Sequence, residues 1–425
     1  MSGVPLVPFK TLVALSVLVV SVGCDTNPTA LRPDGGASVP ADPVYFYEDV
    51  RPILAENCVG CHGPGGIAPF ELTAYDDAVE VGERMAEVTR DRIMPPYIVD
   101  NSGECNHYID ARGLEQAEID LIGDWVRGGM LEGDPTTSAP PVAQLPTLEV
   151  VDSTLDMGAE YAPRSAEDDD YRCFVVEPDW TGDQFLTGAD VRPGNPEIVH
   201  HMIVFAPVDA AEGAAARALD GSDGRPGYTC FGDAVVFALP VIVWAPGVGA
   251  QHFPERTGIR LDGDVPLIMQ VHYNLTADDG VPDRTRVDLE LADSVEDEAW
   301  MGLVADFGLN LPPRMESTSN DYQGGIAFAP DGPLRVHAAY PHMHTLGRSM
   351  RVEAMDAGNT CMVDVPRWDF NWQGGFFYET PIDLDAGQFM RLRCDYDTRE
   401  RDSATVWGDR TSDEMCLSFF YVTQR

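Results

Sequence analysis

A series of short apolar stretches, separated by Gly, Pro and Asp, makes up most of the chain and constrains its fold more than any other feature. From about Leu148 onward the helical repeat of apolar residues disappears, and β-branched and aromatic residues gather in EIVHHMIVFAP, PLIMQVHYNL, LRVHAAYPHMH, QFMRLRC and EMCLSFFYV. Such a pattern predicts antiparallel strands. Its length is enough for two antiparallel, jelly-roll-like β-sandwiches, which we place at residues 148–292 and 293–425 after a linker at 136–147.

A CxxCH motif stands well before the predicted strands. Cys58, Cys61 and His62 belong to CVGCH, in which two thiols form thioethers with a c-type haem and the adjacent imidazole ligates the iron. A redox-active CxxC pair or half of a zinc site is the alternative, but neither a second CxxC nor a thioredoxin-like βαβ pattern accompanies the motif. The sequence therefore predicts one covalently bound c-type haem.

The residues around this motif predict a small all-α domain over residues 43–135. Helical patterns occupy VYFYEDVRPILAENC and LEQAEIDLIGDWVRGG, and in the second of these Ile119, Ile122 and Val126 recur at spacings of 3 and 4 before a Gly pair. The segment resembles a monohaem cytochrome c domain from end to end.

The sixth iron ligand is expected from RIMPPY, where Met94 precedes two prolines that stiffen the loop. This setting resembles the Met-Pro-Pro loop of small cytochromes c. Met85 and His107 are the alternatives, because a thioether or a second imidazole can complete the coordination of the iron. We therefore expect Cys58, Cys61, His62 and Met94 to bind the haem.

The N-terminus predicts export. An apolar run over residues 11–23 follows a lysine, has the size of a signal-peptide core and is too short to span a membrane. VGC resembles a bacterial lipoprotein cleavage site with Cys24 as the acylated residue, although Ser21 stands where such sites usually have Leu, so ordinary cleavage is the alternative. We expect a signal peptide at 1–23, a flexible tether at 24–42 and a place in the periplasm or cell envelope, with a lipid anchor to the membrane.

The charge balance disfavours nucleic acid as a partner. The chain has 28 Lys and Arg against 70 Asp and Glu, a formal net charge of −42. Such an acidic surface repels nucleic acid and anionic lipid headgroups.

Six of the nine histidines fall within the predicted strands, and five of these six are candidate metal ligands. His342 and His344 are separated by one residue, so on a strand their imidazoles point to the same side. His200 and His201 are adjacent, and their imidazoles can share a metal only if a bulge, a strand end or different ring nitrogens redirect them. His272 lies in a third stretch, PLIMQVHYNL. A structural role at a strand edge is the alternative for each pair.

Four motifs, VHHM, QVHY, HMHTLG and SDEMC, occur in this order, and together they resemble the copper type II, ascorbate-dependent monooxygenases over roughly residues 165–425. The resemblance implies an electron-transfer copper site at three histidines and an oxygen-binding copper site at two histidines and a methionine. The first site would consist of His200, His201 and His272, and the second of His342, His344 and Met415. Zinc competes for the three-histidine site, whereas a thioether ligand favours Cu(I).

The remaining histidines and two neighbouring methionines are expected to have structural roles. His337 is interpreted as a core residue or a support for a ligand, and His252 as a loop residue. Met202 and Met343 stand beside proposed ligands but point the opposite way along a strand, so we expect them to pack in the core.

The cysteines suit an oxidised, exported protein. The family resemblance implies a Cys394–Cys416 disulfide beside Met415. A Cys173–Cys230 disulfide within the first sandwich is plausible, and Cys105 and Cys361 have no assigned partner, because sequence alone does not determine connectivity.

The resemblance implies a monooxygenase that uses O2 to hydroxylate a C–H bond of a small organic substrate. We expect its electrons to come from an extracytoplasmic donor through the fused c-type haem. A non-catalytic haem and copper electron carrier, or copper-binding protein, is the alternative from another class, and a cytochrome c with an inert β domain is a third.

The resemblance also bears on the substrate. The peptide-hydroxylating members of the family hold their substrate's carboxylate with an Arg two residues before the HxH pair and with an Asn and a Tyr after the Met-Cys pair. Tyr340, Leu417 and Phe419 occupy those positions here. We therefore expect peptides with a C-terminal glycine to be poor substrates.

Overall fold

The computed structural model describes residues 42–425, apart from 65–67, 110, 112, 139, 143–144, 164–168, 231–232, 247, 276–279 and 409–411. The predicted signal peptide, Cys24 and the predicted tether up to residue 41 lie outside the described residues. Within the part of the chain that the structure describes, no helix is long and apolar enough to cross a membrane.

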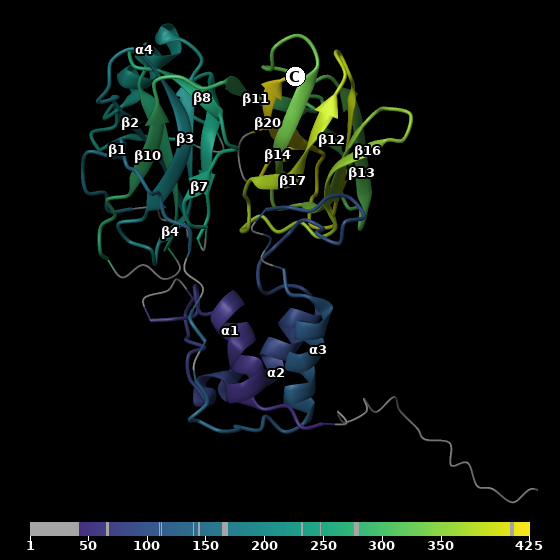
Figure 1. Ribbon diagram of the computed structural model, residues 1–425. Helices are drawn as coiled ribbons and strands as arrows, with labels where there is room; N and C mark the ends of the chain where they lie inside the picture. Colours follow the sequence, from purple (N-terminus) through teal and green to yellow (C-terminus); the bar gives the residue numbers. More distant parts are fainter. Residues whose placement is uncertain are drawn as a thin grey trace, which may run out of the picture. The chain divides into compact units, whose positions relative to one another are not determined.

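The N-terminal part of the described chain is helical (Figure 1). A π-helical turn, η1 (Phe46–Val50), leads directly into α1 (Arg51–Asn57), and α2 (Tyr75–Arg90) and α3 (Gln116–Arg127) follow. Their apolar side chains form one buried cluster, separate from those of the strands. We call η1 and α1 to α3 the helical module. The sequence predicted the helices on either side of α2 but did not identify α2 itself.

The buried stripe of α3 differs by one residue from the predicted one. Ile119 and Ile122 are buried as expected, but the third buried residue is Trp125, which is fully buried, while Val126 is half-buried. The indole N–H of Trp125 donates a hydrogen bond of 3.0 Å to the carbonyl of Leu131. The indole ring of Trp125, which is larger than the side chain of Val126, therefore fills the core at the end of α3. The Leu131 carbonyl there accepts the hydrogen bond that a buried indole N–H needs.

The strands fall into two groups, which confirms the β-rich prediction (Figure 1). The first sandwich comprises β1 (Ser153–Asp156), β2 (Asp169–Val176), β3 (Asp183–Arg192), β4 (Val199–Pro207), β5 (Tyr228–Thr229), β6 (Ala238–Trp244), β7 (Gln251–His252), β8 (Thr257–Asp262), β9 (Leu267–Asn274) and β10 (Arg286–Ala292), with α4 (Ala210–Leu219) after β4. The second sandwich comprises β11 (Asp297–Ala305), β12 (Asn310–Leu311), β13 (Thr318–Gly324), β14 (Leu334–His342), β15 (Gly347–Ala354), β16 (Thr360–Val365), β17 (Phe376–Leu384), β18 (Met390–Tyr396), β19 (Thr405–Val406) and β20 (Leu417–Gln424).

Each sandwich has two layers with an apolar core. In the first, a sheet of order β5-β2-β9-β4-β6 packs against β1-β10-β3-β8, and Met269 and Leu289 represent the two layers in one buried cluster. In the second, β13-β18-β15-β16 packs against β11-β20-β14-β17, with Val352 and Phe420 in the shared core. A parallel pairing of β8 with β11 makes one sheet continuous through both sandwiches.

Three disulfides connect the described cysteines of the β-rich part. Cys173–Cys230 and Cys394–Cys416 are the pairs that the sequence suggested. The third, Cys105–Cys361, joins residues 256 positions apart and was not assigned from sequence. Residues 97–109 lie inside the predicted 43–135 domain, yet Ile98, Val99 and Tyr108 are buried in the core of the second sandwich.

Candidate metal centres

The first candidate centre is made by two neighbouring strands, β4 and β9. His200 and His201 lie on β4, and His272 lies on β9. Val199 pairs with Tyr273 and His201 pairs with His272, so His200 is an extra residue on β4 at a break in the register. A β-bulge of this kind turns a side chain that would otherwise point to the opposite face. The bulge therefore lets two adjacent histidines approach His272.

The three imidazoles meet in a geometry that suits one ion. Their ligand atoms lie within 4.8 Å of one another, and their ring centroids are 4.6 to 5.6 Å apart. Nδ1 of His200, Nε2 of His201 and Nδ1 of His272 are buried and have no hydrogen-bond partner in the part of the chain that the structure describes. Because buried polar atoms are normally paired, three unpaired ring nitrogens aimed at one point fit a bound metal.

Two neighbours on β2 hold His272. Its Nε2–H donates a 2.8 Å hydrogen bond to the Asp169 carboxylate, which leaves Nδ1 as the ligand atom. The ring of Tyr171 stacks on the His272 imidazole at 4.0 Å with an interplanar angle of 5°. Such contacts fix both the tautomer and the orientation of a metal-binding imidazole.

Burial keeps the β4 histidines neutral. Desolvation, and then the neighbouring His272, lowers the pKa of His200 to about 4. The same causes hold the pKa of His201 well below its usual range. A neutral imidazole is the form that binds metals, so both side chains are ready to ligate at neutral pH.

The second candidate centre lies where β14 ends and β20 begins. His342 is the last residue of β14 and pairs with Leu417, the first residue of β20. His344 follows in the turn before β15, and its ring centroid is 5.2 Å from that of His342. Met415 stands two residues before Leu417 and is 6% exposed. The pairing of the two strands therefore brings the HxH pair to the Met-Cys segment.

Glu414 connects these two segments. Its side chain is fully buried and accepts backbone N–H hydrogen bonds from His344, from Leu346 at 3.0 Å and from Met415 at 2.9 Å. Burial raises the pKa of Glu414 to about 7, although all three hydrogen bonds act in the opposite direction. One carboxylate thus sets the backbone on both sides of the candidate site.

His342 and His344 have hydrogen-bond partners that orient them. Nδ1 of His342 lies 2.6 Å from Oε1 of Gln373, an acceptor, so Nδ1 carries the proton and Nε2 is the ligand atom. The indole N–H of Trp368 donates a 3.0 Å hydrogen bond to the His344 carbonyl. Burial, and then His344, lowers the pKa of His342 to about 3.

The histidines and methionines that the sequence assigned to structural roles are either packed in a core or exposed. His337 is buried with Nε2 3.0 Å from Oγ1 of Thr423, and His252 has a side chain that is 47% exposed. Met202 and Met343 are fully buried in the apolar cores of the first and second sandwich.

The CVGCH motif follows α1. Cys58 and Cys61 are half-buried and take part in none of the three disulfides. Burial, and then Cys61, raises the pKa of Cys58 to about 12. Nδ1 of His62 lies 3.1 Å from the carbonyl of Phe70, which can only accept, so Nε2 is left open. An open Nε2 beside two thiols fits haem attachment and axial ligation.

The three candidates for the sixth iron ligand have different surroundings. Met94 is half-buried and follows α2, with its backbone N–H 3.2 Å from the Val88 carbonyl. Met85 is packed inside the helical core. His107 lies in the segment that packs on the second sandwich, where its carbonyl accepts a hydrogen bond from the N–H of Glu379.

Sequence reasoning missed the residues that orient the ligands. Asp169 and Gln373 stand far from the histidines in the chain, and no local pattern indicates them. Glu414 is part of SDEMC, but an acidic residue in a loop is usually exposed. The one hint in the sequence that Glu414 supports the site was its position directly before the Met-Cys pair.

Histidines gather at two places in the pair of β-sandwiches, and His200, His201 and His272 lie close enough together to hold one metal ion. The comparisons show which proteins the chain is similar to. Residues 313–424 match the C-terminal domain of copper type II ascorbate-dependent monooxygenases. The chain is 25% identical over 245 residues to tyramine beta-hydroxylase of Caenorhabditis briggsae, covering 54% of this chain and 40% of the relative. It is 25% identical over 302 residues to dopamine beta-hydroxylase of Equus caballus, covering 66% and 48%, and 25% identical over 252 residues to DBH-like monooxygenase protein 2 of Mus musculus, covering 54% and 39%.

These matches support the copper type II ascorbate-dependent monooxygenase family for the β-rich part of the chain. The chain spans less than half of the length of each of these relatives.

The three hydrogen bonds of Glu414 predict that Glu414→Gln weakens the second centre alone. An amide group has one acceptor oxygen, so its NH2 would face a backbone N–H, at a cost of about 1–3 kcal/mol in unfolding free energy. We expect less copper at the second centre and unchanged copper at the three histidines, measured by metal analysis and by the spectra of each centre. Glu379→Gln, an exposed change on β17, is the control. Equal copper in both variants would contradict the role of Glu414.

Proposed function

We propose that this protein is an exported, copper-dependent monooxygenase that hydroxylates a C–H bond of a small organic substrate with O2. The observation that carries the proposal is the cluster of His200, His201 and His272, each of which has one buried ring nitrogen with no hydrogen-bond partner among the described residues. Similarity of residues 313–424 to a domain of the copper monooxygenases supports the same assignment for the second centre. The three disulfides suit an oxidising compartment.

The two centres are assigned different tasks. His342, His344 and Met415 would hold the copper that meets O2, and His200, His201 and His272 would hold the copper that stores an electron. Copper at these sites would supply one-electron chemistry and the reductive activation of O2. A thioether favours Cu(I), whereas three imidazoles suit copper in both oxidation states.

The protein's own contribution is to fix the ligands before the metal binds. Asp169 and Gln373 each accept a hydrogen bond from the N–H of one imidazole, which leaves the other ring nitrogen of that imidazole for the metal. Glu414 sets the backbone of His344 and Met415. Ligands held in this way lose little conformational freedom on binding, which favours metal affinity and a defined geometry.

The helical module is assigned as a cytochrome c domain. Cys58 and Cys61 would carry the haem, and His62 and Met94 would ligate its iron. Met94 is favoured over Met85, which fills the helical core, and over His107, which lies in the segment packed on the second sandwich. Such a haem would pass electrons from an extracytoplasmic donor to the copper sites. Acylation of Cys24, outside the described residues, stays a prediction from the sequence.

Met415→Ala tests the copper assignment. The variant loses the thioether but keeps both imidazoles, so we expect it to lose hydroxylation while retaining about one copper per chain and an unchanged haem spectrum. Copper analysis and substrate-dependent O2 uptake measure the two effects. His252→Ala, at an exposed histidine outside both centres, should keep full turnover. Normal turnover by Met415→Ala would remove Met415 from the site, and no turnover by the copper-loaded wild type would favour the non-catalytic carrier.

At three positions near the second centre, the protein offers no charged side chain that could bind a carboxylate of the substrate. Tyr340 and Leu417 are buried and uncharged, and Phe419, half-buried, pairs with Tyr340 across β20 and β14. We therefore predict little hydroxylation of peptides with a C-terminal glycine compared with amines or apolar compounds. A screen with ¹⁸O2 and mass detection of the product measures this. Efficient hydroxylation of the peptides would contradict it.

Removal of the haem tests the electron route. Cys58→Ser with Cys61→Ser cannot form thioethers, so we expect turnover with a cytochrome-type donor to be lost and turnover with a small-molecule reductant to persist. Haem oxidation in pre-reduced wild type, mixed with O2 and substrate, should proceed at the rate of product formation. Equal turnover of the variant with both donors would show that the haem is not the electron feed.

A further inference from the structure

The segment between α2 and α3 leaves the helical module and covers one side of the second sandwich. β16 is the last strand of the four-stranded sheet and β17 is the last strand of the nine-stranded sheet, so each has an edge that no further strand of its sheet covers. Residues 97–109 lie against both edges. Unpaired strand edges bind added strands readily, because their backbone N–H and C=O groups are available.

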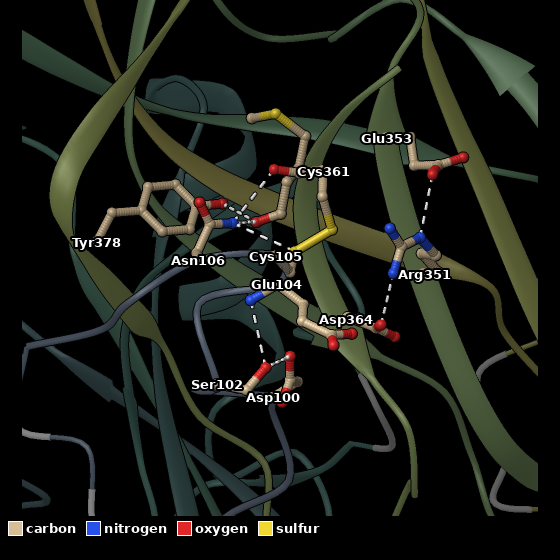
Figure 2. The surroundings of a disulfide bond; sticks show 11 residues. Asp100, Ser102, Glu104, Cys105, Asn106, Arg351, Glu353, Cys361, Asp364 and Tyr378 are labelled. Carbon is tan, nitrogen blue, oxygen red and sulfur yellow. Dashed lines mark hydrogen bonds and ion pairs between the residues drawn. A yellow bond between two sulfur atoms is a disulfide. The ribbon is translucent and has the colours of Figure 1, made fainter. Parts of the chain in front are cut away.

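The contacts with β16 are both covalent and polar (Figure 2). Cys105 forms the disulfide with Cys361. The side-chain amide of Asn106 donates hydrogen bonds to the carbonyls of Met362 at 2.8 Å and of Cys361 at 3.2 Å. The backbone N–H of Asp100 donates one of 2.9 Å to the Asp364 carbonyl.

The contacts with β17 follow the pattern of an added strand. Tyr108 and Tyr378 form an antiparallel bridge. The N–H of Ile109 donates to the Phe377 carbonyl at 2.8 Å, and the N–H of Glu379 donates to the His107 carbonyl at 2.9 Å. Tyr108 is 2% exposed and belongs to the core of the second sandwich. Because of these contacts, residues 97–109 pack as part of the second sandwich.

Few residues connect this segment to α2, and hydrogen bonds join the chain before it to the chain after it. Only Pro95 and Pro96 separate Met94 from Tyr97, and proline restricts the backbone. Arg92, two residues after the end of α2, donates hydrogen bonds of 3.0 Å to the Leu114 carbonyl and of 3.1 Å to the Gln116 side chain. These bonds join the chain just before residues 97–109 to the chain just after them, where both return to the helical module.

We propose that residues 97–109 are a docking arm that holds the helical module on the β16 and β17 edges of the second sandwich. The module is then a bound partner of the sandwich that carries His342, His344 and Met415, rather than a domain that moves freely on the 136–147 linker. The association depends only on contacts within this chain. Its purpose, to keep an electron donor with the copper sites, rests on the proposed function.

A short series of residue contacts also connects the arm to the second centre. The ring of Tyr97 contacts that of Phe376 edge-to-face, with centroids 5.7 Å apart. Phe376 pairs with Ala339 of β14, three residues before His342. Gln373, three residues before Phe376, accepts the hydrogen bond from His342. The arm therefore docks at the strands that position the HxH pair.

Cleavage of the linker in the full-length, haem- and copper-loaded protein tests the arm. A protease site placed within residues 136–147 leaves the Cys105–Cys361 disulfide of the arm as the only covalent connection between the described parts of the two fragments. With all cysteines present, the fragments should remain one species on a non-reducing denaturing gel and separate on reduction. Cys173→Ser with Cys230→Ser, which removes a disulfide outside the arm, should behave in the same way. Separation without reduction would contradict the arm.

The non-covalent contacts are tested in the cut protein with Cys105→Ser and Cys361→Ser. We expect the fragments to elute together from a sizing column under native conditions, and to separate when Tyr108→Leu and Asn106→Ala are added. If the double Ser variant separates as readily as the fourfold variant, the arm does not hold the module. Unchanged copper content at the three histidines checks that the first sandwich is still folded.

A kinetic readout separates this proposal from the proposed function. Detachment replaces an intramolecular donor at an effective concentration on the order of millimolar by a free donor at about 10 micromolar, so turnover with a cytochrome-type donor should fall about 100-fold in the cut fourfold variant. Turnover with a small-molecule reductant should stay unchanged. If no variant turns over with any reductant, the proposed function fails while the gel and sizing results still decide the arm. Equal donor-driven turnover with and without the arm would overturn its purpose.

Discussion

The break in register between β4 and β9 at His200 is the constraint on which the first metal centre depends. Without the extra residue, His200 and His201 would point to opposite faces of the sheet, and only one of them could face His272. The bulge costs one paired residue in the ladder. In return, the sheet places three imidazoles within reach of one ion, on strands whose positions are fixed by the core beneath them.

The second centre is built differently, from the junction of two strand ends. The turn after β14 and the loop before β20 lie beyond the last pair of the ladder, His342 with Leu417, so the ladder itself does not hold them together. The buried carboxylate of Glu414 does so, because it binds backbone N–H groups on both segments. The disulfide Cys394–Cys416 secures the residue next to Met415. Rigid ligands on a rigid scaffold are a general requirement of metal sites.

Local patterns made part of this structure predictable, and long-range contacts made the rest unpredictable. HxH spacing, the CVGCH motif and the switch from helical to alternating periodicity are local, so the β-rich region and the candidate ligands could be named from sequence. The bulge at His200 appeared only as one of several ways to redirect a side chain. The choice of Trp125 over Val126 depends on the cavity that α3 faces. The docking arm could not be foreseen, because Cys105 and Cys361 are 256 residues apart and no pattern connects them.

Copper X-ray absorption of the reduced, copper-loaded protein tests the central claim most directly, namely that the chain holds two chemically different copper sites. The account predicts about two coppers per chain, with imidazole ligation at both and a sulfur ligand at one of them. A single copper per chain, a spectrum with no sulfur ligand, or preferential binding of zinc at the three histidines would contradict it.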